Sequence, residues 1–345
     1  MTAGRRAAAR SRPESAAQNR DRPYSYRLKE TAVTRLLDLA PRALERLRGA
    51  ELVEAIRASE GRTIAAETIV ATGPLLDRVS NPELVAAFGA DIIVLNLYDV
   101  DRPQIAGMPR RTGDAAPDDD AAAFGAVATG AGRTAGDVAR WTGRVTAVNL
   151  EPVDEALASF PAGRRATARN AERLVEQGAA IAVITGNPGT GVTIEAIERA
   201  TRTIREATQD RLVLFCGRIH AAASGQEVMT ARDVDRLARA GAHGVVLPAP
   251  GTTPGSSMEA AVARVEAAHE RGLLAWNGIG TSQEGAGTGV IERIGIDSKA
   301  SGADVHHIGD SGFFGVAPPE NVYAYSLAIR GRRHTWHRMA GSPQR

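Results

Sequence analysis

The chain has 345 residues, of which 43% are hydrophobic and 24% are charged, and this balance excludes a coiled coil, a collagen or a largely disordered protein. Its 42 Lys and Arg face 40 Asp and Glu, so the net charge of +2 predicts no nucleic-acid partner, and no apolar run reaches the roughly 18 residues of a membrane span. The single cysteine, Cys216, excludes an internal disulfide, and these features together predict a cytoplasmic protein without a membrane partner.

The two ends of the chain differ from its middle. Residues 1–27 are rich in Arg, Ala, Ser and Pro without apolar periodicity, which predicts a disordered arm. Residues 28–60 carry apolar side chains at helical spacing, and we expect a helical extension there. Residues 332–345 are basic and are expected to form a C-terminal tail. The main domain should therefore span 61–331.

Eight short apolar runs alternate with helix-like segments within 61–331. The runs are Ile64–Ala71, Asp91–Leu97, Val145–Leu150, Ala180–Thr185, Leu212–Cys216, Gly244–Leu247, Leu273–Asn277 and Val305–Ile308. Strands separated by helices indicate parallel βαβ units. Eight such units close a barrel, so the predicted fold class is α/β, a (β/α)8 TIM barrel. A doubly wound open sheet is the alternative, but no Gly-x-Gly-x-x-Gly follows the first strand.

A long insertion, roughly Asp99–Arg133, follows the second predicted strand and is expected to be a lid. Acid–base side chains gather at the ends of the strands, where such barrels carry their active sites. Those predicted to be catalytic are Glu67, Asp99, Glu151, His220, His306 and Asp310. Neighbouring residues of a strand point to opposite faces, so His306 and His307 cannot both face the interior, and the sequence leaves open which one does.

Gly-rich loops follow the last two predicted strands and offer backbone N–H groups to an anion. The predicted anion cup consists of Gly278, Gly280, Thr281, Ser282, Gln283, Gly309 and Ser311. Further substrate-binding candidates at the other strand ends are Asn96, Asn149, Thr185, Asn187 and Arg218. A small anionic substrate is therefore expected.

Only two lysines occur, Lys29 ahead of the barrel and Lys299 in a predicted helix. No imine-forming lysine therefore stands at a strand end, and Schiff-base chemistry is not expected. Glu67 and His220, with one of the two adjacent histidines, could instead hold a divalent metal, which keeps a metal-dependent hydrolase as an alternative. No cofactor is indicated beyond that possibility.

The strand-end strings also carry a resemblance. They are Leu95-Asn96-Leu97-Tyr98-Asp99, Asn149-Leu150-Glu151-Pro152, Thr185-Gly186-Asn187-Pro188-Gly189, Leu247-Pro248-Ala249-Pro250-Gly251, Gly280-Thr281-Ser282-Gln283-Glu284 and His306-His307-Ile308-Gly309-Asp310. Together they resemble a poorly characterised bacterial family of TIM barrels, loosely labelled phosphoenolpyruvate phosphonomutase-like or haloacid dehalogenase-like hydrolases. The resemblance spans roughly residues 36–339 and implies the barrel rather than one activity.

These observations predict a lyase or isomerase that acts on a small phosphorylated or carboxylated metabolite. The chemistry would be acid–base catalysis at the C-terminal face of the barrel. The alternatives are the metal-dependent hydrolase and a barrel that binds a metabolite without turning it over. A homo-oligomer is compatible with the sequence.

Overall fold

The computed structural model describes residues 1, 34–109, 111, 129–221 and 228–344. The arm expected over 1–27 lies outside these residues, except for Met1, and so does most of the expected lid, namely 110 and 112–128. None of the helices in the described part of the chain has the length and apolar character that crossing a bilayer requires.

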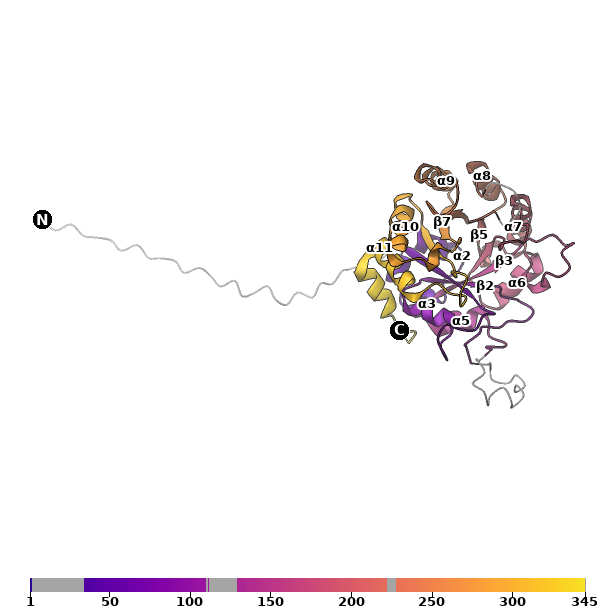
Figure 1. Cartoon of the computed structure of the whole chain (residues 1–345), viewed down its shortest axis with the longest axis horizontal. Helices are drawn as coiled ribbons and strands as arrows, with labels where there is room; N and C mark the ends of the chain where they lie inside the picture. Colours follow the sequence, from indigo (N-terminus) through magenta and orange to yellow (C-terminus); the bar gives the residue numbers. More distant parts are fainter. Residues whose placement is uncertain (2–33, 110, 112–128, 222–227, 345) are drawn as a thin grey trace. The chain divides into compact units, whose positions relative to one another are not determined.

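Eight parallel strands close into a barrel, which confirms the predicted fold (Figure 1). They are β1 (Thr63–Ile69), β2 (Ile92–Asn96), β3 (Val145–Leu150), β4 (Ile181–Ile184), β5 (Val213–Gly217), β6 (Gly244–Pro248), β7 (Leu274–Ile279) and β8 (Val305–Ile308). Each strand pairs with the next one in the chain, and β8 pairs with β1 through partners such as Ala65 and His307. The closed sheet has no free edge, so every strand end meets its neighbours around one ring.

Helices surround the strands (Figure 1). They are α3 (Asn81–Ala87), α5 (Ala135–Thr142), α6 (Ala168–Glu176), α7 (Ile194–Thr208), α8 (Ala231–Arg239), α9 (Met258–Glu270), α10 (Thr288–Ala300) and α11 (Pro319–Met339). Ser or Thr caps six of these helices, and its hydroxyl accepts from a backbone N–H in the first turn, as Thr134 does at α5. Gly331 breaks α11 with φ of 71°, and the segment expected as a basic tail continues as helix to Met339.

The expected helical extension forms η1 (Leu36–Asp38), α1 (Pro41–Leu44) and α2 (Gly49–Arg57). Its buried residues, including Leu44 and Ile56, belong to the same apolar cluster as the lumen residues Val213 and Trp276. The extension therefore closes the barrel opposite to the strand ends that carry the polar residues.

Strand alternation separates two apolar cores. In β2, Ile92 and Val94 belong to the lumen cluster, whereas Ile93 and Leu95 belong to the cluster between the sheet and the outer helices. The same alternation decides which strand residues can reach the mouth of the barrel.

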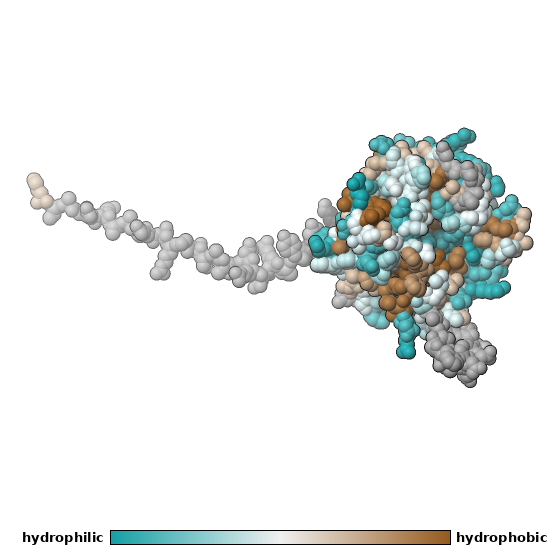
Figure 2. Space-filling model, viewed as in Figure 1, coloured by the Kyte–Doolittle hydropathy of each residue, from teal (hydrophilic) through white to brown (hydrophobic). Residues whose placement is uncertain are grey.

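Polar residues cover much of the face shown in Figure 2, and the largest apolar cluster lies below its centre. Among the described residues, the most exposed aromatic side chains are Phe313 and Phe314, which are 73% and 56% exposed. They follow β8 by only a few residues.

Asp91, directly before β2, is fully buried and binds partners from two distant parts of the chain. Its Oδ2 accepts hydrogen bonds from the Ile64 backbone N–H at 2.8 Å and from Arg330 at 2.6 Å, and its Oδ1 accepts from Arg338 at 2.6 Å. Burial acts to raise the pKa of Asp91, but the guanidinium groups of Arg330 and Arg338 outweigh it and hold the pKa below its usual range. These ion pairs fix α11 to the start of β2.

Two further contacts extend this cluster. Arg338 also donates to the backbone carbonyls of Leu36 at 2.8 Å and Leu39 at 3.1 Å, and so ties α11 to the helical extension. Arg144 is buried beside it and donates to backbone carbonyls, among them those of Ala90 at 2.7 Å and Arg338 at 2.8 Å. Burial and the charge of Arg338 lower the pKa of Arg144 to about 9.

His306 faces away from the lumen. Its Nε2 lies 3.0 Å from the Gly61 carbonyl oxygen, which can only accept, so Nε2 carries the proton and Nδ1 accepts from Ser298 Oγ at 2.8 Å. Burial lowers the pKa of His306 to about 4, so the ring is neutral at neutral pH. This position corrects the expectation that His306 moves protons at the site, because its ring is buried between the sheet and α10.

We predict that Asp91→Asn lowers the free energy of unfolding by about 3–5 kcal/mol, because buried guanidinium groups lose their anion. Urea denaturation at pH 7 measures the loss. The control Asp38→Asn breaks the exposed pair with Arg35 and should change stability by less than about 1 kcal/mol. An equally small effect of Asp91→Asn would contradict the structural role of the cluster.

We predict that His306→Gln flattens the pH dependence of stability below pH 6.5. In the unfolded chain His306 takes up a proton below its usual pKa, whereas in the folded chain it does so only near pH 4. Wild type should therefore lose about 3 kcal/mol as the pH falls across this interval. Urea denaturation of both proteins at pH 7 and pH 4 tests this, and equal losses in the two proteins would refute it.

Candidate active site

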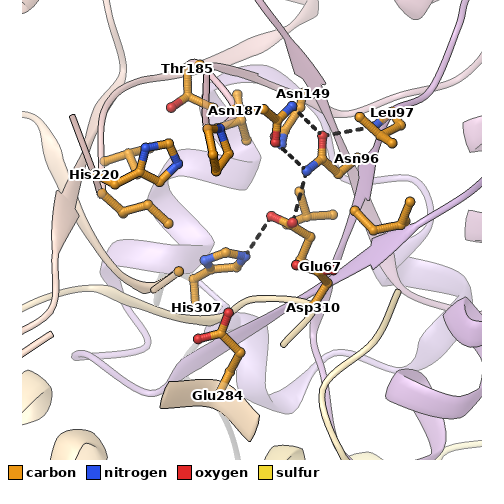
Figure 3. A pocket seen from close by; sticks show the side chains of 18 of the residues that line it. Glu67, Asn96, Leu97, Asn149, Thr185, Asn187, His220, Glu284, His307 and Asp310 are labelled. Carbon is orange, nitrogen blue, oxygen red and sulfur yellow. Dashed lines mark hydrogen bonds and ion pairs between the residues drawn. The ribbon is translucent and has the colours of Figure 1, made fainter. Parts of the chain in front are cut away.

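A cavity of about 290 Å³ lies at the C-terminal ends of the strands, and we call it the barrel-mouth cavity (Figure 3). Its lining includes eight residues singled out from the sequence: Glu67, Asn96, Asn149, Thr185, Asn187, His220, Gly280 and Asp310. His307, one of the two adjacent histidines between which the sequence did not decide, also lines it. The lining further includes four residues that were not selected from the sequence: Glu284, Trp276, Ile219 and Leu97. The structure therefore brings together polar residues from most of the strand ends.

Glu67 and His307 form the closest acid–base pair of the cavity (Figure 3). Oε2 of Glu67 lies 3.4 Å from Nε2 of His307, and the two side chains are only 13% and 6% exposed. The His307 ring packs against Trp276 with ring centres 5.8 Å apart, and Trp276 packs edge-on against Phe215. Strand alternation places His307 inside the barrel because His306 faces the helices.

Two further carboxyl groups share the cavity with this pair. Glu284, after β7, is 3% exposed, and burial raises its pKa. Its Oε2 has no hydrogen-bond partner among the described residues. Burial also raises the pKa of Asp310, and the nearby charge of Glu67 adds to that effect. Both groups therefore keep a proton to higher pH than an ordinary carboxyl group.

His220 lines the cavity from the segment after β5. Burial lowers its pKa, with the charge of Arg218 acting in the same direction, so the ring is neutral at neutral pH. His220 can therefore accept a proton or a hydrogen bond from a bound molecule.

Glu151, a predicted catalytic residue, is held in a network beside the cavity. Its carboxylate pairs with Arg164 at 2.7 Å and accepts from the side-chain Nδ2 of Asn187 at 2.6 Å. Asn187 in turn bonds to Asn96, whose Nδ2 donates to Glu67 Oε1 at 3.0 Å. Glu151 therefore acts on the cavity through two asparagines rather than from its lining.

Several side chains of the predicted anion cup make contacts within the protein, and Gly280 lines the cavity. A Cβ added at Gly278 or Gly280 would lie only 2.7 or 2.0 Å from side-chain atoms of Ile219. The Thr281 hydroxyl donates to the Thr252 carbonyl at 2.7 Å, and Gln283 donates to the same carbonyl at 3.2 Å. These glycines make room for the Ile219 side chain, and anion binding by the backbone N–H groups of this loop stays a prediction.

The remaining predicted residues lie outside the lining. Ser311 donates to the Val316 carbonyl at 3.2 Å, and a Cβ at Gly309 would meet Glu284 at 3.0 Å. Ser282, at φ of 74°, immediately precedes η4 (Gln283–Gly285). These residues shape the loops after β7 and β8.

Asp99 and Arg218 are also used locally. Asp99 Oδ1 accepts from the backbone N–H groups of Asp101 at 2.8 Å and Arg102 at 3.3 Å, which stabilises the turn after β2. Arg218 is 1% exposed and its Nη1 lies 3.5 Å from the Val192 carbonyl oxygen. Neither Asp99 nor Arg218 lines the cavity, and their expected roles in catalysis and in binding stay predictions.

The charge of the lining bears on what can bind. None of the described residues that line the cavity is Lys or Arg, whereas Glu67, Glu284 and Asp310 are acidic. Within the described ranges, no group of three or more His, Cys, Asp or Glu side chains could hold a metal ion. Lys299 lies on α10 and donates to the Ile329 carbonyl, and Lys29 falls outside the described residues.

The sequence left the choice between His306 and His307 open and missed Glu284, for different reasons. Both residues of the His306-His307 pair are buried, so apolar patterning could not say which one faces the lumen. Glu284 stands in a string that was interpreted through its glycines and hydroxyls. Its burial depends on how η4 folds, and no local sequence pattern predicts that fold.

Three solved structures illustrate the similarity to known proteins. A proposed fructose-1,6-biphosphate aldolase from Coccidioides immitis is 11% identical, with a TM-score of 0.43 over 83% of this chain and 94% of that chain. A thiamine phosphate pyrophosphorylase from Pyrococcus furiosus is 10% identical, with a TM-score of 0.42 over 78% and 96%. A 2,3-dimethylmalate lyase of the PEP mutase/isocitrate lyase superfamily is 13% identical, with a TM-score of 0.42 over 78% and 81%.

No curated protein matches the sequence. Residues 37–345, which include the whole barrel and the cavity residues described above, match the family described as Domain of unknown function (DUF7916). The chain therefore belongs to this family.

Proposed function

We propose that this protein is an enzyme, an isomerase or a lyase, that moves protons on a small uncharged hydroxy-carbonyl compound. One observation carries the proposal: the Glu67–His307 pair shares a small cavity with two carboxyl groups whose pKa values are raised. Groups whose environments push their pKa values apart are suited to act as base and acid on one substrate.

Glu67, paired with His307, is the proposed base, and Glu284 or Asp310 is the proposed acid. In an isomerisation the base removes a proton from the carbon beside the carbonyl group, and the electron pair moves towards the carbonyl oxygen. The acid donates its proton to that oxygen, which gives an enediol. The base then returns its proton to the former carbonyl carbon, while the hydroxyl group on the neighbouring carbon gives its proton to the ionised acid and becomes the new carbonyl. Both groups regain their starting states, and no external oxidant is needed.

The same two groups support a lyase reaction. The base removes the proton of a hydroxyl group, the adjacent carbon–carbon bond breaks as a new carbonyl forms, and the acid protonates the carbon that keeps the electron pair. Both reactions require one base and one acid, each within hydrogen-bond reach of the atom whose proton it moves. Asn149 and Thr185 line the same cavity and can orient its hydroxyl groups.

The proposed substrate is uncharged, in place of the anion expected from the sequence. No Lys or Arg among the described lining residues would neutralise a phosphate or carboxylate, and Glu67 would repel it. A second negative charge in a buried site without a cation is costly. The volume of about 290 Å³ also favours a small molecule.

We predict that Glu67→Gln lowers turnover by roughly 10²–10⁴-fold, because the base is replaced by an amide of similar shape. Wild type and variant would be incubated in D2O with a panel of small aldoses and ketoses, and proton NMR would follow carbon–deuterium exchange and product formation. Glu172→Gln removes an exposed carboxyl group on α6 and serves as the matched control. Turnover of phosphorylated or carboxylated compounds alone would contradict the proposed substrate class.

We predict that Glu284→Gln raises the free energy of unfolding, and that the difference from wild type is larger at higher pH. The raised pKa means that ionisation of Glu284 is harder in the folded than in the unfolded chain, so wild type loses stability as the pH rises through the folded pKa. The amide variant lacks this loss. Urea denaturation at pH 5 and pH 8 measures it, and a pH-independent difference would show that Glu284 is not held protonated.

A further inference from the structure

We infer that Asn96 is a positioning residue that fixes Oε1 of Glu67 as a hydrogen-bond acceptor, with its orientation set by the Glu151 carboxylate through Asn187. The inference rests on the proposed function, since it specifies which oxygen of the proposed base handles the proton. It also gives Glu151, which lies outside the cavity lining, the role of orienting Asn96 through Asn187.

The first step starts at Glu151, which is 1% exposed and paired with Arg164. Its Oε2 accepts from the Asn187 backbone N–H at 2.8 Å and its Oε1 from Asn187 Nδ2 at 2.6 Å. An ionised carboxylate can only accept hydrogen bonds. Asn187 must therefore present its NH2 group to Glu151, and its Oδ1 is left to face Asn96.

The second step fixes the amide of Asn96. Asn187 Oδ1 accepts from Asn96 Nδ2 at 2.9 Å, and Asn96 Oδ1 accepts from the Leu97 backbone N–H at 2.8 Å. Leu97 adopts a left-handed backbone with φ of 60°, which is unusual for a residue other than glycine. Two independent anchors, a carboxylate at one end and a backbone N–H at the other, thus demand the same orientation.

The third step reaches the base. Asn96 Oδ1 accepts from the Leu97 backbone N–H and also from Asn187 Nδ2 at 3.2 Å, so the Nδ2 of Asn96 donates to Oε1 of Glu67 at a distance of 3.0 Å. Because Oε1 accepts this hydrogen bond, it binds a proton less readily. Oε2, in contrast, lies 3.4 Å from Nε2 of His307. Proton exchange is therefore confined to Oε2, on the side of His307.

Other titratable groups also face Glu67. They are His307 from β8, Asp310 after β8, Glu284 after β7 and His220 after β5, and any test must leave all four in place. Asn149 supplies a matched control, because it lines the same cavity from β3 and its Oδ1 has no hydrogen-bond partner in the part of the chain that the structure describes. Asn96→Leu and Asn149→Leu therefore make the same replacement with and without the contact to Glu67.

The experiment compares urea unfolding of the full-length Asn96→Leu and Asn149→Leu proteins at pH 4 and pH 7, in the same stabilising osmolyte. A hydrogen bond to an ionised group contributes about tenfold or more to an equilibrium. Relative to the control, Asn96→Leu should therefore shift the unfolding equilibrium about tenfold further at pH 7 than at pH 4, because a carboxyl group that takes up a proton accepts the bond less strongly. Asn96→Ser and Asn149→Ser repeat the comparison if the leucine variant does not fold.

A second arm uses activity. The acid limb of the kcat/KM profile should move up by about one pH unit in Asn96→Leu, because the ionised base has lost its donor. Glu151→Gln should move it in the same direction, and the double variant should move it no further than Asn96→Leu alone, because the effect of Glu151 passes through Asn96.

The two arms separate the possible failures. If the stability penalty of Asn96→Leu over its control is the same at both pH values, the positioning role is overturned. If the penalty depends on pH but no variant or wild type turns over any uncharged compound, the network stands and the proposed enzymatic function fails. Additive shifts of the acid limb in the double variant would overturn the part assigned to Glu151.

Discussion

The buried carboxylate of Asp91 connects parts of the chain that are far apart in sequence. It accepts from the backbone of β1, from Arg330 near the middle of α11 and from Arg338 near its end. Arg338 also donates hydrogen bonds to backbone carbonyl groups of the helical extension. One anion thus joins the first strand, the second strand, the last helix and the extension beneath the lumen. Such a cluster tolerates loss of a partner poorly, because the remaining charges would be buried unpaired.

The closed sheet then decides how the strand residues are used. Alternation sends His307 into the lumen beside Trp276 and sends His306 into the polar contacts with Ser298 and Gly61. Two adjacent residues of the same type therefore have opposite environments. Burial without a charged partner keeps His306 neutral, whereas His307 lies within reach of Glu67. A closed barrel enforces this division because neither face of a strand can turn towards solvent.

The site itself is defined by carboxyl and amide groups rather than by cations. The glycines after β7 admit the Ile219 side chain, and the hydroxyl and amide groups beside them bind a carbonyl of the chain. The same residue types in an emptier loop would cradle an anion. Here Ile219 packs against the glycines, and the polar side chains of the cavity include Glu67, Glu284, Asp310, Thr185, the two histidines His220 and His307, and the asparagines. This composition is the basis for an uncharged substrate.

Local patterns in the sequence were sufficient for the barrel, because alternating apolar strands and amphipathic helices follow from short-range periodicity. They also placed polar residues at the strand ends, since Glu67 and Asn96 stand within apolar runs and Asn187 and Asp310 follow such runs by two residues. Tertiary structure alone decided three things: which histidine faces the lumen, that Ile219 fills the glycine loop, and that Glu284 is buried beside Glu67. Each depends on contacts between residues far apart in the chain, and the packing that creates those contacts has no signature in a local stretch of sequence.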